Sequence, residues 1–339
     1  MTKLRLANRL FCKSREIKLH LIFIVMLAAV IGVLISGKAG YCVDGDGHLY
    51  VGSQNSDEVL RYEQGTGHYL TTFVQRGDGG LNKPTGMVFG PDGNLYVCSY
   101  YSDEVLRYEA ATGNFMDAFV SASSGGLSYP YGITFGPDGS LYVSAESTEE
   151  VLRYNGQTGD FIETFVSHGS GGLNTAKSIA FGQDGNLYVA SFGGNQILKY
   201  NGVNGSFMGV FIDGGSGSLN GPEGMAFYYG YFYVASNNNS RVLRYDAITG
   251  AFVDVFIPSY SGGLNGPFGL VIRDGAMFVA SSNSNSVIRY RMDTGAPVDE
   301  FVDSGDGGLD FPTYLAFAPR TVSASGGGGG GCFIGALGE

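Results

Sequence analysis

A segment of about 46 residues repeats six times along this chain of 339 residues, and this repeat constrains the fold more than any other feature. The sequence Phe-Gly-Pro-Asp-Gly-Asn-Leu-Tyr-Val, which begins at Phe89, recurs with small changes at Phe135 and Phe181. The tyrosines that end a Val-Leu-Arg-Tyr-like segment are spaced by 46, 46, 46, 45 and 45 residues; they are Tyr62, Tyr108, Tyr154, Tyr200, Tyr245 and Tyr290. A fixed period of this length indicates a solenoid or a propeller.

Each repeat predicts four short β-strands. In the second repeat the strands are expected over residues 86–89, 94–99, 104–108 and 114–120. Pro91-Asp92-Gly93 and Thr112-Gly113 supply the turns, because proline presets φ and glycine accepts the left-handed conformation. A Gly-Gly-Leu-like element then leads into the next repeat.

The two ends of the repeat region favour a closed ring over a linear stack. Such four-stranded units bury both faces only when neighbouring sheets cover them, and a linear stack also needs atypical capping repeats. Thr313–Phe317 matches the first strand of a further repeat, and no other strand of a seventh repeat follows it. The sequence therefore predicts an all-β, six-bladed β-propeller of four-stranded antiparallel blades, in which this C-terminal strand completes the blade of residues 48–74.

The N-terminus is predicted to be a targeting segment. Six basic residues and one acidic residue occupy positions 1–18, and an apolar stretch from Leu21 to Ile35 follows them. Its length suits a signal peptide better than a membrane span, which needs about 20 residues, although an uncleaved anchor is the alternative. Both interpretations export the rest of the chain, so we expect a secreted, periplasmic or cell-surface protein. The domains are then a signal peptide or anchor (1–39), the propeller (40–320) and a Gly-rich tail (321–339).

The charge of the exported part limits its partners. Residues 1–39 hold seven of the 20 basic and one of the 31 acidic residues, so without them the net charge is −17. Such a surface repels polyanions, which argues against nucleic-acid binding. The predicted partner is an extracellular protein, glycan or small ligand, and the protein is expected to be a monomer that touches a membrane only through an uncleaved N-terminus.

The chain has few cysteines, one of which, Cys12, lies in the targeting segment. Cys98 stands where other repeats have Gly, Ser or Ala and is predicted to be a small buried residue. Cys42 and Cys332 flank the ring and could pair across its closure, or Cys332 could attach the flexible tail to a surface.

The repeat resembles the NHL type. The order Pro-x-Gly, Asp-Gly-Asn-Leu-Tyr-Val, Val-Leu-Arg-Tyr, Thr-Gly and a terminal Phe-Val is similar to NHL repeats over residues 41–317, and more broadly to gluconolactonase-like and amidating-lyase-like six-bladed propellers. The resemblance implies the architecture but no single activity, because this fold hosts many functions. The chain also departs from the pattern, since Ser or Ala replaces the aspartate that NHL-like repeats place after the second strand; the positions are Ser53, Ser99, Ala145, Ser191, Ser236 and Ser281.

Many charged residues recur from repeat to repeat and are explained by structure. Arginines ten residues before an acid predict ion pairs across the last hairpin of a blade; the pairs are Arg107–Asp117, Arg153–Glu163, Arg244–Asp254 and Arg289–Asp299. The Asp of each Asp-Gly turn is assigned to turn chemistry, because one carboxylate per blade does not supply the six to eight oxygens of a calcium site.

Residues that differ between repeats are the candidates for function. They follow the second strand or stand between Pro and Gly before the first, and both sets are expected on one face near the channel mouth. The segment Thr175–Ser178 departs furthest from the rule. The candidate ligand-binding residues are Tyr100, Tyr131, Glu146, Lys177, Glu223 and Asn237. The structural alternative is a solvated rim in which Lys177 pairs with Glu146 or Glu223.

The sequence favours binding over catalysis. It contains no nucleophile elbow, phosphate loop or CxxC motif, and its four histidines have no metal spacing. We predict a non-catalytic module that presents one channel face to its ligand, with no catalytic residue, no resident metal and no cofactor. The alternative is a propeller hydrolase or lyase that uses Ca²⁺ or another divalent metal, for which Glu146, Glu223 and Asn237 would be the best residues.

Overall fold

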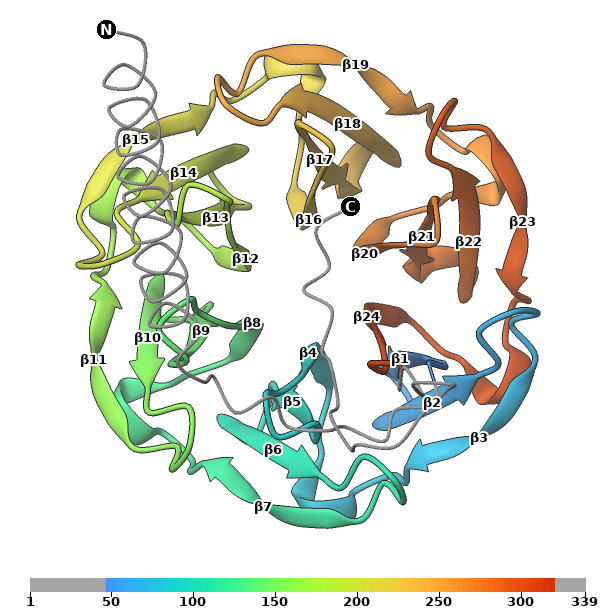
Figure 1. Ribbon diagram of the computed structural model, residues 1–339, viewed down its shortest axis with the longest axis horizontal. Coiled ribbons are helices and arrows are strands. Elements are labelled where there is room, and N and C mark those ends of the chain that lie inside the picture. Colours follow the sequence, from blue (N-terminus) through green and yellow to red (C-terminus); the bar gives the residue numbers. More distant parts are fainter. Residues whose placement is uncertain (1–46, 321–339) are drawn as a thin grey trace, which may run out of the picture. The chain divides into compact units, whose positions relative to one another are not determined.

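The computed structural model describes residues 47–320, which form a ring of six four-stranded antiparallel sheets around a central channel (Figure 1). In each blade the first strand lies at the channel and the fourth lies at the outer rim. Residues 1–46 and 321–339 lie outside the described part. The six sheets confirm the six-bladed prediction. The physical reason is that repeats of this size cover one another's apolar faces only when they are arranged radially.

The strands follow the repeat closely. Blade 1 comprises β24 (Pro312–Phe317), β1 (Leu49–Ser53), β2 (Glu58–Tyr62) and β3 (Tyr69–Val74), and blade 2 comprises β4 (Pro84–Phe89), β5 (Leu95–Ser99), β6 (Glu104–Tyr108) and β7 (Phe115–Val120). Blade 3 comprises β8 (Pro130–Phe135), β9 (Leu141–Ala145), β10 (Glu150–Tyr154) and β11 (Phe161–Val166), and blade 4 comprises β12 (Ala176–Phe181), β13 (Leu187–Ser191), β14 (Gln196–Tyr200) and β15 (Phe207–Ile212). Blade 5 comprises β16 (Pro222–Tyr228), β17 (Tyr231–Ser236), β18 (Arg241–Asp246) and β19 (Phe252–Ile257), and blade 6 comprises β20 (Pro267–Arg273), β21 (Ala276–Ser281), β22 (Ser286–Arg291) and β23 (Pro297–Val302).

Short 3₁₀ turns complete the blades. Six of them are the Gly-Gly-Leu-like elements that lead from one blade to the next: η1 (Asp78–Gly80), η2 (Ser124–Gly126), η3 (Ser170–Gly172), η4 (Ser216–Ser218), η6 (Ser261–Gly263) and η8 (Asp306–Gly308). The other two follow the second strands of blades 5 and 6: η5 (Asn237–Asn239) and η7 (Ser282–Ser284). Among residues 47–320, no helix is long and apolar enough to cross a membrane.

The ring closes where the repeat predicted. Strand β24 pairs antiparallel with β1, with Leu49 opposite Phe317 and Val51 opposite Leu315. Beside this pair, the amide of Ala318 donates a hydrogen bond of 3.0 Å to the carbonyl of His48. The blade of the first repeat is thus completed by the last strand, as expected.

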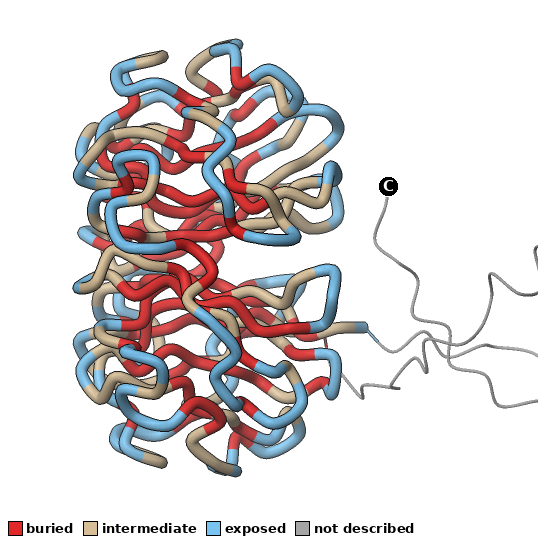
Figure 2. Tube along the Cα trace, turned by 90° about the vertical axis from the view of Figure 1, so that its left-hand side faces the viewer, coloured by how far each residue is buried: buried red, intermediate tan, exposed pale blue. Residues whose placement is uncertain are grey.

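The core lies between the blades. In blades 1 to 4 the second-strand tyrosine packs edge-on between two phenylalanines, one from its own blade's outer strand and one from the next blade's inner strand. For Tyr96 these are Phe119 and Phe135, at 4.9 and 5.2 Å between ring centroids. Aromatic pairs prefer this edge-to-face arrangement. Figure 2 shows the result, with buried chain inside the ring and exposed chain at the loops. Cys98 is fully buried in this core, as predicted.

Candidate functional site at one channel mouth

The two variable sets lie side by side at the same end of the blades. Antiparallel strands reverse direction at alternate ends, so the loop after each second strand returns to the end where the first strand begins. Backbone hydrogen bonds join the two segments in every blade, such as Tyr100 N–H to the Lys83 carbonyl at 3.2 Å and Glu146 N–H to the Tyr129 carbonyl at 3.0 Å. The expected placement of both sets on one face therefore follows from the backbone.

Lys177 stands at the centre of the cluster. Its ammonium nitrogen lies 2.8 Å from Glu146 Oε2 and 3.6 Å from the centroid of the Tyr131 ring. The Phe192 ring flanks it at 5.6 Å. The side chains of Lys177 and Glu146 are only 11% and 20% exposed, so this ion pair and cation–π contact are partly shielded from water. The ion pair expected for a structural rim is formed with Glu146 rather than Glu223.

Glu223 lies deeper in the channel than this pair. It is 2% exposed, and the hydroxyl of Tyr131 donates a hydrogen bond of 3.3 Å to Glu223 Oε1. Burial raises the pKa of Glu223 to about 7, against the opposing effects of Lys177 and of the hydrogen bond from Tyr131. Its second oxygen, Oε2, is buried and accepts no hydrogen bond from the described residues. A buried carboxyl group with a free acceptor is an uncommon arrangement, since nearly all buried polar groups are paired.

Tyr314 completes the inner part of the cluster, and the sequence analysis missed it. Its ring meets Tyr131 edge-on at 5.9 Å, and burial raises the pKa of its hydroxyl well above the usual value, with the charge of Glu223 adding to the shift. The signal was present, because Tyr314 stands where four of the six Pro-x-Gly segments have glycine. A tyrosine at this inner position occupies space in the channel that the glycines leave open.

Four tyrosines gather where blades 2 and 3 meet. Tyr100 stacks on Tyr129 with 4.7 Å between centroids and 11° between planes, and it meets Tyr131 edge-on at 6.2 Å. Tyr101 stands edge-on to Tyr100 at 5.1 Å. Tyr101 and Tyr129 were not among the predicted site residues, although the doublet Tyr100-Tyr101 and the segment Tyr129-Pro-Tyr131 mark this junction in the sequence.

The structure thus links five of the six candidates through side-chain contacts, whereas the side chain of Asn237 is directed to the next blade. Contacts link Tyr100, Tyr131, Glu146, Lys177 and Glu223 into one cluster. Asn237 instead donates a hydrogen bond of 3.1 Å to the Pro267 carbonyl at the start of β20. The equivalent residue Ser282 binds the Pro312 carbonyl in the same way, so this contact joins neighbouring blades.

The cluster is a poor match for a divalent metal. Calcium needs six to eight converging oxygens, and no group of three or more His, Cys, Asp or Glu side chains suited to a metal occurs in residues 47–320. Glu146 is engaged by the Lys177 ammonium, which would repel a cation placed between Glu146 and Glu223.

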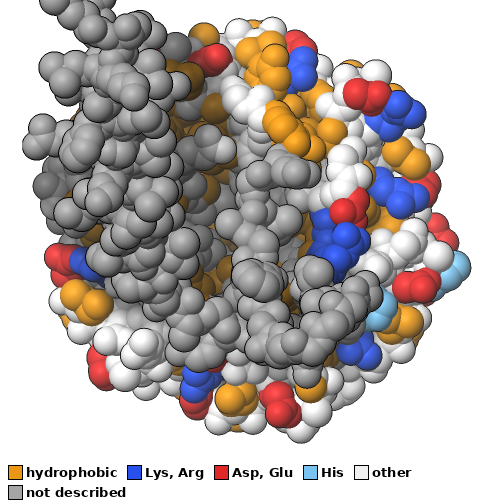
Figure 3. Space-filling view, viewed as in Figure 1, with side chains coloured by type: hydrophobic (Ala, Val, Ile, Leu, Met, Phe, Trp, Pro, Cys, Tyr) orange, Lys and Arg blue, Asp and Glu red, His pale blue; other side chains and the backbone are white. Residues whose placement is uncertain are grey.

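The opposite face carries repeated ion pairs. Arg107 and Arg153 each contact the acid across the hairpin, at 2.5 Å to Asp117 and 2.8 Å to Glu163, as predicted. The pairs Arg244–Asp254 and Arg289–Asp299 are formed as well. In blade 4, where this arginine is Lys199, the lysine pairs with the turn residue Asp184 at 2.8 Å. Basic and acidic side chains accordingly lie next to one another around this face (Figure 3).

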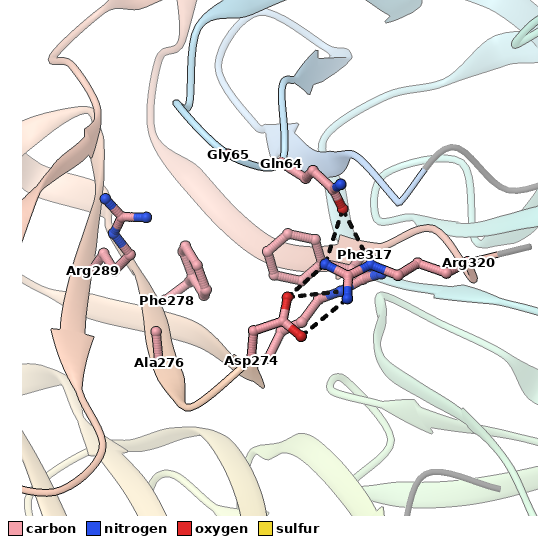
Figure 4. A pocket seen from close by; sticks show the side chains of 9 residues that line it. Gln64, Gly65, Asp274, Ala276, Phe278, Arg289, Phe317 and Arg320 are labelled. Atoms are coloured by element: carbon pink, nitrogen blue, oxygen red, sulfur yellow. Dashed lines mark hydrogen bonds and ion pairs between the residues drawn. The ribbon is translucent and has the colours of Figure 1, made fainter. Parts of the chain in front are cut away.

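A hollow of about 260 Å³ lies on the same face, between blades 1 and 6. Arg320 reaches across it, with its guanidinium 2.5 Å from Asp274 and 3.2 Å from Gln64 Oε1 (Figure 4). Arg289 at its edge is paired with Asp299. Because these arginines already contact acceptors, the hollow does not offer a free anion site. The contacts of Arg320 instead link the end of the ring to blades 1 and 6.

The predictions for the two chain ends concern residues outside the described part. These are the targeting segment of residues 1–39, pairing or surface attachment through Cys42 and Cys332, and the tail of residues 321–339.

Comparison with known proteins relates the chain to others by fold. No model of a known protein family matches it, and no curated protein is similar to it in sequence. A chain in the crystal structure of a nidogen/laminin complex matches with a TM-score of 0.65 and 14% identity, covering 80% of this chain and 98% of that chain.

Two crystal structures of virginiamycin B lyase from Staphylococcus aureus also match. A catalytically inactive variant with quinupristin has a TM-score of 0.56 at 15% identity, covering 74% of this chain and 80% of the lyase. The selenomethionine-substituted lyase has a TM-score of 0.58 at 15% identity, covering 81% and 89%. At these identities the likeness shows the fold alone: the chain is a six-bladed β-propeller that resembles a component of a protein–protein complex and an enzyme.

Proposed function

We propose that this protein is an exported, NHL-like β-propeller that acts as a non-catalytic binding module. It presents the mouth that holds Tyr100, Tyr131, Glu146, Lys177 and Glu223 to an extracellular protein, glycan or small ligand. One observation carries the proposal: side chains that differ from blade to blade converge at this mouth, whereas the charged groups of the opposite face recur and pair with one another. Binding sites commonly place a few polar groups among aromatic ones in this way.

The fold is consistent with this role. A propeller of similar fold occurs in the crystal structure of a nidogen/laminin complex. The acidic composition of the exported part disfavours nucleic acid as the ligand.

The test is a binding measurement on a matched pair of proteins. Wild-type protein and a Lys177→Met, Glu146→Gln double variant would be applied to immobilised glycans and to extracellular peptides. Replacing both partners leaves neither charge unpaired, so the melting temperature should stay within a few degrees. We expect any ligand retained by the wild type to bind the variant at least about tenfold more weakly. A ligand that binds both proteins equally would place the binding site elsewhere.

A propeller lyase or hydrolase is the second candidate. The likeness to virginiamycin B lyase supports it, together with buried Glu223, whose pKa of about 7 suits a general base. Elemental analysis of protein purified without chelators separates the two candidates. One divalent metal per chain, lost on Glu223→Gln substitution, would favour the enzyme.

A further inference from the structure

We propose that the tyrosines at the junction of blades 2 and 3 dock an arginine- or lysine-bearing segment of a partner protein. This inference rests on the proposed binding function and names the partner's chemistry. It concerns the outer part of the mouth, where Tyr101 is 57% and Tyr129 38% exposed. These two rings meet at 77° with 6.0 Å between centroids, so they form two walls of an open corner.

The backbone of Tyr129 is held in a strained conformation. Its φ of 52° lies in the left-handed region, which is strained for a bulky side chain. Glycine stands at the equivalent position in two other blades, as Gly221 and Gly266. Asp103 Oδ1 fixes Tyr129 by accepting its backbone N–H over 2.7 Å, and Tyr100 stacks on its ring. The outer wall of the corner is therefore rigid before a partner arrives, which reduces the entropy lost on binding.

The charge around the corner is complementary to a basic partner. Two adjacent positions carry this charge: the last residue of the loop after the second strand and the first residue of the third strand. In blades 1–3 both positions are acidic, as Asp57-Glu58, Asp103-Glu104 and Glu149-Glu150. The same positions in blades 4–6 are Asn195-Gln196, Ser240-Arg241 and Asn285-Ser286. These three acidic blades are consecutive in the ring, and the tyrosine corner lies between the second and third (Figure 1).

Counter-charges neutralise this half of the face only in part. Arg76 approaches Asp57 at 3.7 Å but is 74% exposed, and His168 lies 3.6 Å from Glu149, where it is charged only when protonated. Lys83, at the position equivalent to Tyr129 where blades 1 and 2 meet, adds a third cation, whose ammonium group donates to Asn55 Oδ1 over 3.0 Å. Within residues 47–320, neither Glu104 nor Glu150 forms an ion pair. Deeper in the mouth, the unpartnered Oε2 of Glu223 adds a buried acceptor below the tyrosines.

The neighbouring junction, of blades 3 and 4, already shows how such a group is held. Lys177 places its ammonium over the Tyr131 ring and beside the Glu146 carboxylate. Cations bind the faces of aromatic rings, and nearby carboxylates strengthen the attraction. Tyr101 and Tyr129 are tyrosine rings exposed to solvent, and Asp103, which accepts the Tyr129 backbone N–H, places a carboxylate next to them. A guanidinium or ammonium group from outside would therefore find the same two kinds of contact.

The experiment measures binding of a labelled peptide of alternating arginine and glycine to purified full-length protein, with a peptide of alternating glutamate and glycine as control. The variant is Tyr101→Ala with Tyr129→Gly, because glycine accepts the left-handed conformation at 129 without strain. The matched control is Tyr229→Ala, which removes a tyrosine that is 63% exposed at the turn between β16 and β17 on the opposite face.

We expect the basic peptide to bind the wild type and the Tyr229→Ala control within twofold of each other. The double variant should bind about five- to tenfold more weakly, and higher salt should weaken binding to the wild type. Absence of binding, equal affinity for the double variant, or equal binding of the acidic peptide would overturn the inference. If a glycan or neutral peptide then bound through Lys177 and Glu146, the proposed function would stand without a basic partner.

Discussion

At the scale of single residues, Glu223 occupies the most unusual environment in the channel. A glutamate ordinarily titrates near pH 4.5, and burial raises the pKa of this one to about 7. Between these two pH values the folded protein binds a proton at Glu223 that the unfolded chain has lost. Stability therefore falls as the pH rises through this window and levels off above it.

Glu223→Gln should remove this pH dependence. The amide keeps the shape and can still accept the hydrogen bond from Tyr131, but it carries no charge to bury. We expect the variant to be more stable than the wild type at pH 8 by roughly 1–3 kcal/mol and about equally stable at pH 4.5. Urea unfolding at a series of pH values measures this difference. Parallel stability curves for the two proteins would mean that Glu223 is not buried as a carboxylate.

The sequence identified most residues of this site, but not which of them meet in the channel and which bind a neighbouring blade. The irregular positions stood out against the repeat, and five of the six named residues meet. Tyr101, Tyr129 and Tyr314 were not predicted as site residues, because they occupy ordinary loop or strand positions of the repeat. Asn237 was included because its position varies, yet it binds the backbone of the next blade. Which variable residue faces the channel depends on the rotation of each blade, and a repeat pattern does not contain that information.

At the scale of elements, the Thr-Gly turn between β6 and β7 shows how blades contact each other. Gly113 has a φ of 78°, and a Cβ atom built there would overlap the carbonyl oxygen of Phe73 on the outer strand of the previous blade. Equivalent glycines in the other blades meet the equivalent carbonyl. Turn chemistry predicted glycine here, but the close approach of the neighbouring blade is a second and stronger reason for it.

Gly113→Ala should therefore destabilise the protein far more than the turn alone requires. We expect a loss of about 3 kcal/mol or more, because backbone of two blades must move apart. Gly126→Ala is the control, since Gly126 has a φ of 89° but no atom within 4 Å of the added Cβ; it should cost about 1 kcal/mol. Thermal or urea unfolding of both variants gives the comparison, and equal losses would show that the blade contact contributes nothing.

At the scale of the whole molecule, the ring depends on the pairing of its last strand with its first repeat. Besides the β24–β1 ladder, Thr313 donates a hydrogen bond of 3.0 Å to the Pro84 carbonyl of blade 2. Strand β24 therefore contacts both the rest of blade 1 and the neighbouring blade 2. Without β24, blade 1 would lose its channel strand, and the apolar faces of its neighbours would be exposed.

Removing residues 311–339 should lower the melting temperature sharply, by about 10 °C or more, or abolish cooperative unfolding. Truncation after Arg320 is the control, because it leaves β24 and the Arg320–Asp274 contact intact. Circular dichroism melts of the three proteins provide the measurement. Closure by β24 would be contradicted if the longer deletion melted like the full chain.

The sequence by itself determined the blade number, the four strands of each blade, the closing strand and the pairs across the hairpins. These properties depend on periodicity, turn residues and strand alternation, which act over a few residues and repeat six times. Only the tertiary structure decided that Lys177 pairs with Glu146, that Glu223 is buried beneath Tyr131, and that four tyrosines gather at the junction of blades 2 and 3. These contacts join different blades around the channel, so they depend on the tilt of each sheet and the packing between sheets rather than on any segment's own pattern.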